Sequence, residues 1–318
     1  MNLHYFYKSF LCSACAFFII TVGLAQPEGF AVLVGVQSTN AVCKPGDFFD
    51  NRATAGVGKD IDKMRQLLRQ AKFKDANVKP LLTNTETTAA SILKSLSDMI
   101  PKAKAGDLVV FYFSGHGDTL RDTNRDELSK FDGVLIASDR CVIDDELDPI
   151  WQKFLPGVRL VMIADACHAE SSYKINFLDH RITIEPSPKR QTGTRGRNSL
   201  AEKSLQPTVR FKNEILFDQS RRDAFGTCLE TALDPAQPYQ MIYVSASHEA
   251  TTTGGASNGS LFTDELYRNA RLVDPNQPVR LTYRKLMERI DTCPSTVTYA
   301  EVGVLSPQFK NDYFLKIR

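Results

Sequence analysis

Short apolar runs alternate with helical segments through the first half of this chain, and that order restricts the fold more than any other feature. The runs are rich in β-branched and aromatic residues, which predicts buried strands at residues 30–36, 78–82, 107–115 and 158–166. Between them, apolar residues at helical spacing or acidic first turns predict helices over residues 58–73, 87–100 and 144–155. Strands that are apolar on both faces and separated by helices are typical of a parallel sheet. We therefore expect an α/β fold with a mostly parallel central sheet and helices on both faces.

The second half of the chain begins with a polar stretch and then resumes the same pattern. We expect a strand over residues 241–247, helices over 260–272 and 282–292, and a last strand over 313–317. The composition is ordinary for a soluble globular protein, with 42% hydrophobic and 24% charged residues in 318. The net charge of +2 gives no reason to expect nucleic acid as a partner.

The N-terminus has the pattern of a secretory signal peptide. Lys8 precedes an uncharged, mostly apolar run, and small residues at Gly23 and Ala25 suit a signal peptidase, so residues 1–25 are expected to be removed. The expected location is therefore the periplasm or the exterior. An uncleaved anchor helix, the one way in which the chain would contact a membrane, and a buried helix are the alternatives.

Five cysteines remain after this cleavage: Cys43, Cys141, Cys167, Cys228 and Cys293. An odd count in an exported protein suggests one free, reactive thiol. The other four can form up to two disulfides or stay unpaired, and the spacing does not decide between these outcomes. Their spacing does not match that of a zinc site.

Two strands of the expected sheet end at reactive side chains. His116 follows the strand at 107–115, and Cys167 follows the strand at 158–166. Because ligands bind beyond the carboxyl ends of parallel strands, both side chains are expected at one edge of the sheet. An imidazole activates a thiol and later protonates the leaving amine. A core cysteine and a turn histidine are the alternatives when each residue is taken alone.

The two motifs, "YFSGHGD" and "DACHAES", resemble those of the caspase and metacaspase superfamily of cysteine peptidases. Cys167 stands 51 positions after His116, close to the separation known for caspases. The resemblance implies a caspase-like three-layer sandwich, with His116 as general base and acid and Cys167 as nucleophile. It also implies that the amides of Gly117 and Cys167 bind the oxyanion.

The same resemblance divides the mature chain. Residues 26–178 correspond to the large catalytic portion, residues 179–210 to a flexible basic linker, and residues 211–318 to a small-subunit portion that completes the same domain. The linker has few large apolar residues, so it is not expected to order itself. Self-cleavage is expected there, after one of the basic residues Lys189, Arg190, Arg195 and Arg197; a charged loop that is never cut is the alternative.

The residue two positions before the nucleophile indicates specificity. Asp165 stands where caspases that cut after aspartate have glutamine, and metacaspases, which cut after Arg or Lys, have aspartate. By the same resemblance, Asp60 is the second acid of the substrate pocket and Ser114 lines it. A carboxylate in a partly dry pocket selects a cation. The alternatives are a structural acceptor for Asp165 and a helix N-terminal charge for Asp60.

No cofactor is required for this chemistry, but calcium is a candidate ligand. Asp139, Asp144 and Asp145 resemble acids that bind activating calcium in metacaspases, and carboxylate oxygens are ligands that calcium prefers. The alternative is an acidic helix start.

The sequence as a whole predicts an exported cysteine endopeptidase that acts on proteins or peptides after Arg or Lys. A catalytically silent caspase-like scaffold and a transpeptidase with the same dyad are the alternatives.

Overall fold

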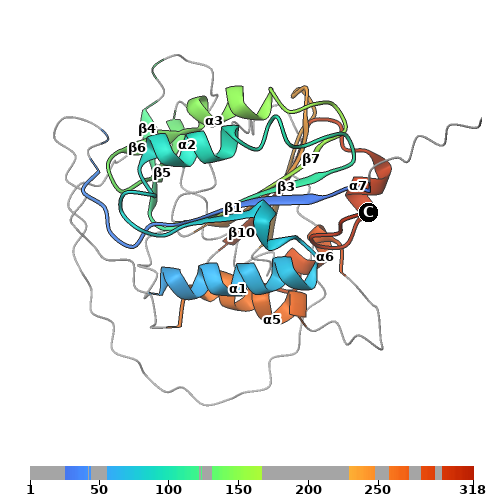
Figure 1. Ribbon diagram of the computed structural model, residues 1–318, viewed down its shortest axis with the longest axis horizontal. Helices are drawn as coiled ribbons and strands as arrows, with labels where there is room; N and C mark the ends of the chain where they lie inside the picture. Colours follow the sequence, from blue (N-terminus) through green and yellow to red (C-terminus); the bar gives the residue numbers. More distant parts are fainter. Residues whose placement is uncertain are drawn as a thin grey trace, which may run out of the picture.

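The computed structural model describes residues 26–41, 43, 56–121, 123, 131–166, 229–247, 258–271, 281–290 and 296–318. A central sheet lies between two layers of helices (Figure 1). One face is covered by α2 (Ala89–Ser97) and α3 (Asp144–Trp151), and the other by α1 (Val57–Gln70), α5 (Leu261–Arg271) and α6 (Tyr283–Met287). This three-layer arrangement confirms the predicted α/β class. No helix in this part of the chain combines the length and apolar character needed to cross a membrane.

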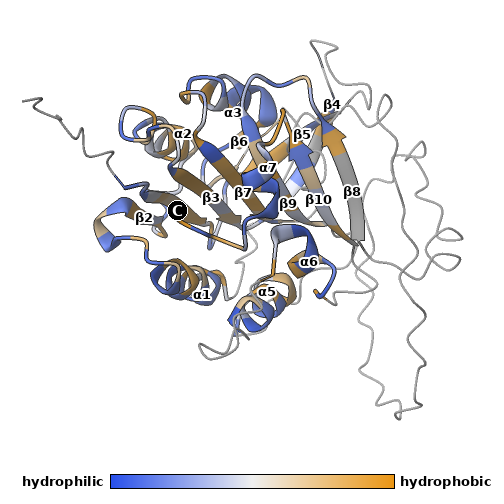
Figure 2. Cartoon of the chain, turned by 90° about the vertical axis from the view of Figure 1, so that its right-hand side faces the viewer, coloured by the Kyte–Doolittle hydropathy of each residue, from blue (hydrophilic) through white to orange (hydrophobic). Residues whose placement is uncertain are grey.

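Seven strands form the central sheet, and every neighbouring pair is parallel except β9 and β10. In spatial order they are β2 (Val78–Leu81), β1 (Gly29–Gly35), β3 (Leu108–Ser114), β7 (Arg159–Asp165), β9 (Gln240–Ser247), β10 (Thr296–Val302) and β8 (Leu229–Asp234). Strands β1, β3 and β7 are buried along their whole length. Figure 2 shows β3 and β7 as apolar strands enclosed between the helix layers. Enclosure on both faces explains why their sequences are continuous apolar runs.

Among the described residues, five helices begin within two residues of where the sequence predicts them, and the helix at Pro307–Asn311 is not predicted. The helices are α1 (Val57–Gln70), α2 (Ala89–Ser97), α3 (Asp144–Trp151), α5 (Leu261–Arg271), α6 (Tyr283–Met287) and α7 (Pro307–Asn311), with a short 3₁₀ turn at Asp75–Asn77. Thr88 caps α2 by accepting a hydrogen bond from the Ser91 amide at 3.3 Å. Helices α1 and α5 lie side by side beneath the sheet (Figures 1 and 2).

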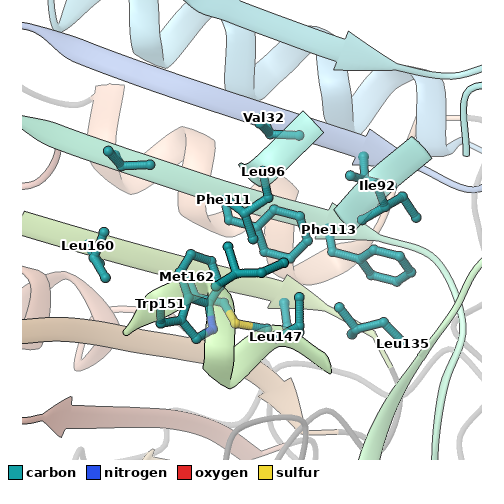
Figure 3. Packing of buried hydrophobic residues seen from close by; sticks show 14 of the residues in the cluster. Val32, Ile92, Leu96, Phe111, Phe113, Leu135, Leu147, Trp151, Leu160 and Met162 are labelled. Atoms are coloured by element: carbon teal, nitrogen blue, oxygen red, sulfur yellow. The ribbon is translucent and has the colours of Figure 1, made fainter. Parts of the chain in front are cut away.

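The core on the α2 and α3 face is apolar and aromatic (Figure 3). Phe111 of β3 meets Trp151 of α3 edge to face, with ring centroids 6.0 Å apart. Leu96 of α2 and Met162 of β7 complete the same layer. Close packing of large side chains makes this layer the main source of hydrophobic stabilisation on that face.

A second sheet, which the sequence pattern does not predict, stands beside the first. Its antiparallel strands are β4 (Gly117–Arg121), β5 (Phe131–Ile136) and β6 (Cys141–Ile143). These strands are short, so their periodicity is too brief to recognise. Strand β4 begins directly after His116, so the small sheet lies next to the edge of the central sheet at which β3 ends.

The predicted last strand at 313–317 is wrong. Its one sheet-like contact is an isolated bridge from Tyr313 to Thr282, and Leu315 has a positive φ of 58°, which interrupts an extended strand. The segment instead packs at the end of the central sheet where β7 begins. There the buried guanidinium of Arg159 donates to Asp312 Oδ2 at 2.9 Å and to the Lys316 carbonyl at 2.8 Å. Strand β10 (Thr296–Val302) is the last strand along the described part of the chain.

Candidate active site

The two motif-bearing strands, β3 and β7, are neighbours in the central sheet. They run parallel with Ser114 opposite Asp165, and the Gly115 amide donates to the Asp165 carbonyl at 3.2 Å. His116 comes two residues after Ser114, and Cys167 comes two residues after Asp165. The strands that precede the two motifs are therefore neighbours and end at the same edge of the central sheet. Cys167 itself lies outside the described residues, so its pairing with His116 stays a prediction.

His116 is held at the junction of the two sheets. It lies between the end of β3 and Gly117, the first residue of β4, and its own carbonyl accepts the Ile136 amide of β5 at 2.9 Å. The imidazole-bearing residue is half-buried. A backbone fixed on both sides suits a side chain that must keep a defined position during catalysis.

The side chains of Asp60 and Asp165 are buried and lie close together, although they belong to different elements. Asp60 projects from the first turn of α1 and is 1% exposed, and Asp165 ends β7 and is 3% exposed. Ser114, at the end of β3, donates its hydroxyl to Asp60 Oδ2 at 3.1 Å. The structure thus brings together the three residues predicted to line a substrate pocket.

A turn before α5 joins these two acids. The main-chain amide of Ser260 donates to Asp60 Oδ1 at 2.9 Å, and the Ser260 hydroxyl donates to Asp165 Oδ2. Thr263 also donates its hydroxyl to Asp165 Oδ2, at 2.5 Å, and Tyr112 lies 2.6 Å from that threonine oxygen. Sequence reasoning missed Ser260, Thr263 and Tyr112. A serine directly before a helical pattern predicts an N-cap, but nothing in that pattern indicates contact with the acids.

The electrostatics of this pair favour a cation. Burial, and then the charge of Asp165, raises the pKa of Asp60 to about 7, although the Ser260 amide, Lys63 and the Ser114 hydroxyl oppose the shift. Burial and both acids also raise the pKa of Tyr112 well above its usual value, so that group stays neutral. Two carboxylates at close quarters repel each other, and a positive charge between them relieves that repulsion.

Lys63 provides a partial counter-charge at the rim of the pair. Its ammonium lies 3.9 Å from Asp60 Oδ1 and 3.1 Å from Asp264, and it donates to the Asn258 carbonyl at 2.5 Å. Because Asp264 and the carbonyl already occupy this ammonium, it neutralises the buried pair only in part.

The predicted calcium ligands have different settings. Asp139 Oδ1 accepts the Ala89 amide of α2 at 2.8 Å, so this carboxylate serves the start of a helix. Asp144 is buried at the start of α3, and burial, followed by the charges of Asp132 and Asp145, raises its pKa to about 7.

Asp132 is therefore the acid that acts most strongly on Asp144, and the sequence analysis did not single it out. Within the described ranges, no group of three or more His, Cys, Asp and Glu side chains is placed to hold a metal ion. Calcium binding stays a prediction that these residues do not by themselves support.

A disulfide between Cys43 and Cys141 ties the segment after β1 to strand β6. Beside this disulfide is a cavity of about 280 Å³. None of the predicted site residues lines the cavity, whose lining consists of Cys43, Leu120, Arg121, Thr123, Asp132, Arg140, Cys141, Ile143 and Glu146.

Six further residues from the sequence analysis lie outside the described residues. They are Cys228, Cys293 and the four predicted self-cleavage residues Lys189, Arg190, Arg195 and Arg197.

Comparison with known proteins agrees with this geometry. Residues 31–176 match the family model described as metacaspase, peptidase C14 domain. Metacaspase-4 of Arabidopsis thaliana is 30% identical over 146 residues, which are 44% of this chain and 33% of that protein. Metacaspase-1 of Ajellomyces capsulatus is 32% identical over 116 residues, which are 34% of this chain and 33% of that protein. The chain thus spans about a third of the length of these relatives.

The fold has a counterpart among solved structures. The crystal structure of protein GSU0716 from Geobacter sulfurreducens aligns with a TM-score of 0.60 at 19% identity, over 92% of this chain and 99% of that one. At this identity the likeness concerns the fold alone. The match of residues 31–176 to the metacaspase family model confirms the predicted resemblance to the caspase and metacaspase superfamily over that part of the chain.

Proposed function

We propose that this protein is a cysteine endopeptidase that uses a dyad of Cys167 and His116 and cleaves peptide bonds after Arg or Lys. The observation that carries the specificity is the buried pair of acids, Asp60 and Asp165, at the strand ends that carry the two motifs. The match of residues 31–176 to the metacaspase family model supports the class of reaction.

The chemistry follows from the two side chains. His116 accepts the thiol proton of Cys167, and the thiolate attacks the carbonyl carbon of the scissile bond. The amides of Gly117 and Cys167 stabilise the resulting oxyanion. His116 then gives its proton to the leaving amine, and water, deprotonated by the same imidazole, hydrolyses the thioester and restores the thiol.

The acid pair accounts for the choice of substrate. A guanidinium or ammonium beside Asp60 and Asp165 offsets their mutual repulsion and receives charge-assisted hydrogen bonds. An aspartate side chain would add a third negative charge in a dry site, where like charges repel strongly. The pair therefore favours Arg and Lys and disfavours Asp.

The test compares the mature chain, starting at Gln26, with its Cys167→Ala variant. Both are assayed under reducing conditions with fluorogenic peptides that end in Arg, Lys or Asp. Turnover of the Arg or Lys peptides by the wild type alone is expected. Equal turnover by both proteins, or preferential turnover of Asp peptides, would contradict the proposal. If the folded protein turns over none of them, the scaffold becomes the better account, and product masses separate hydrolysis from transpeptidation.

Self-processing and calcium activation are parts of the same proposal. The wild type is expected to nick itself after Lys189, Arg190, Arg195 or Arg197, while Cys167→Ala stays intact; equal nicking of both would point to another protease. Calcium is expected to raise turnover and the melting temperature relative to a chelator. If Asp144→Asn, which removes a predicted ligand, responds to calcium as the wild type does, the ion acts elsewhere.

Export after cleavage of residues 1–25 is likewise proposed. The disulfide between Cys43 and Cys141 supports it, because disulfides persist mainly in oxidising compartments. N-terminal sequencing of the secreted or periplasmic protein tests it: a start at Gln26 is expected, and an intact Met1 in the membrane fraction would favour an anchor.

A further inference from the structure

The turn formed by Asn258, Gly259 and Ser260 packs closely against the side chain of Asp60. Gly259 has a φ of +105°, and a Cβ atom at this position would collide with Asp60 Oδ1. Lys63 also holds the turn by donating to the Asn258 carbonyl at 2.5 Å. The close approach places the Ser260 amide 2.9 Å from Asp60 Oδ1.

The direction of the hydrogen bonds at Ser260 is fixed by its neighbours. Its oxygen accepts the Thr263 amide at 3.0 Å, as an N-cap does, so its own proton is directed to Asp165 Oδ2. Thr263 directs its hydroxyl proton to the same oxygen, which leaves the Tyr112 hydroxyl as the donor to Thr263. Ser260 is thus the residue that donates to both acids, one through its main chain and one through its side chain.

We propose that Ser260 is a positioning residue for substrate selection: its amide and hydroxyl hold Asp60 and Asp165 in one orientation that receives a single cationic side chain. The inference rests on the proposed function and deepens it, since it assigns the α5 turn a part in the pocket. Each carboxylate has about four lone-pair positions. The donors on the turn take up some of them and leave the acids oriented for a ligand.

Charged and titratable groups from each neighbouring element face this pair. Lys63 comes from α1 and Tyr112 from β3, while Asp264 of α5 reaches the pair only through Lys63. Because the Ser260 hydroxyl donates to Asp165, its loss is expected to weaken cation binding by leaving that acid less well oriented. A merely structural serine would weaken binding no more than the loss of another helix cap does, and a threonine that keeps the hydroxyl would not selectively restore binding.

The experiment measures binding of benzamidine, a small amidinium, to full mature protein carrying Cys167→Ala, by calorimetry from pH 5.5 to 9. Ser260→Ala removes the hydroxyl, and Ser260→Thr keeps one. Thr263→Val removes the second donor to Asp165 without touching the N-cap, so it remains informative if Ser260→Ala folds poorly. Ser306→Ala is the matched control, because Ser306 caps α7 in the same way.

Wild-type affinity is expected to rise with pH through a midpoint near 7, where Asp60 releases its proton. Ser260→Ala and Thr263→Val should each weaken binding about tenfold at pH 7, because both hydroxyls donate to Asp165. Ser260→Thr should stay within about threefold of the wild type, and Ser306→Ala should match it.

Wild-type affinity in a folded Ser260→Ala would overturn the inference and leave the proposed function standing; if Ser260→Ala does not fold, wild-type affinity in Thr263→Val would do the same. So would an equal loss in Ser260→Ala and Ser306→Ala, because that would trace the effect to a lost helix cap. If the wild type binds no benzamidine at any pH, the proposed cation pocket fails, and the role of Ser260 fails with it.

Discussion

Phe111 and Tyr112 are neighbours on strand β3, yet their side chains enter opposite faces of the central sheet. Phe111 joins an apolar layer and packs edge to face against Trp151 (Figure 3). Tyr112 enters the α1 and α5 face, where its hydroxyl begins a hydrogen-bonded chain that ends at Asp165. The layer around Phe111 is therefore apolar and aromatic, whereas the opposite face also holds a polar network next to the strand ends that precede the motifs.

The difference has an energetic consequence. Apolar burial stabilises the fold in proportion to the apolar area removed from water, and the layer around Phe111 contributes mainly in this way. Burying Asp60 opposes folding unless a partner compensates its charge, which is why its pKa rises to about 7. A site that costs stability in the free protein and recovers it when a ligand binds is common among enzymes.

The largest expected effect belongs to the apolar face. Phe111→Ala should lower the free energy of unfolding by about 3–5 kcal/mol, because it opens a cavity against Trp151. Urea unfolding monitored by far-UV circular dichroism measures this loss. A change below about 1 kcal/mol would mean that this layer is not packed as described.

The disulfide is expected to contribute nearly as much, independently of both faces. Replacing Cys43 and Cys141 together with serine should cost about 2–4 kcal/mol, because the bridge closes a loop between residues 98 positions apart in sequence. The double variant is compared with untreated and reduced wild type. If all three unfold at the same urea concentration, the bridge does not stabilise the fold.

The acid pair should show an effect of opposite sign. The folded protein keeps a proton on Asp60 up to about pH 7, whereas an unfolded aspartate releases it near pH 4, so wild-type stability falls as pH rises between these values. Asp60→Asn has no such proton to lose. It should match the wild type near pH 4.5 and exceed it by about 1–2 kcal/mol at pH 8.

Asp62→Asn is the control for this prediction, because Asp62 is exposed on the same helix. Unfolding at the two pH values gives the comparison. A stability gain of Asp60→Asn that is equal at both values, or shared by Asp62→Asn, would show that the buried charge is not its source.

The smallest effect is expected at Tyr112. Tyr112→Phe keeps the ring in the core and removes only the hydroxyl that donates to Thr263, so it should cost about 1 kcal/mol. Its unfolding curve is compared directly with that of Phe111→Ala. A loss as large as that of Phe111→Ala would mean that both faces depend on the same kind of packing.

Continuous apolar runs made the strands of the central sheet predictable, because burial on both faces leaves little room for polar residues. The same reasoning failed for β8 and β10. Strand β10 carries buried Thr298 and Glu301 and so lacks an apolar pattern. It also placed a strand at 313–317, where a hydrophobic segment packs around Arg159 and bends at Leu315 instead.

The site was predictable where its residues adjoin recognisable strands or a helix start, as Ser114, Asp165 and Asp60 do. Ser260 was not, because its partner Asp60 lies 200 positions away in sequence. Thr263 and Tyr112 also meet Asp165 only through folding, and each reads locally as an ordinary helix or strand residue. Which donors satisfy a buried acid is a property of tertiary structure that no local spacing records.

The central claim is that Asp60 and Asp165 select a cationic side chain for cleavage. The most direct test is the ratio of kcat/KM for a peptide ending in Arg to that for the same peptide ending in Asp, measured at pH 8 with wild type and Asp165→Asn. The wild-type ratio should exceed about a thousand, and the substitution should lower it at least tenfold through KM. A wild-type ratio near one, or a ratio that Asp165→Asn leaves unchanged, would contradict the account.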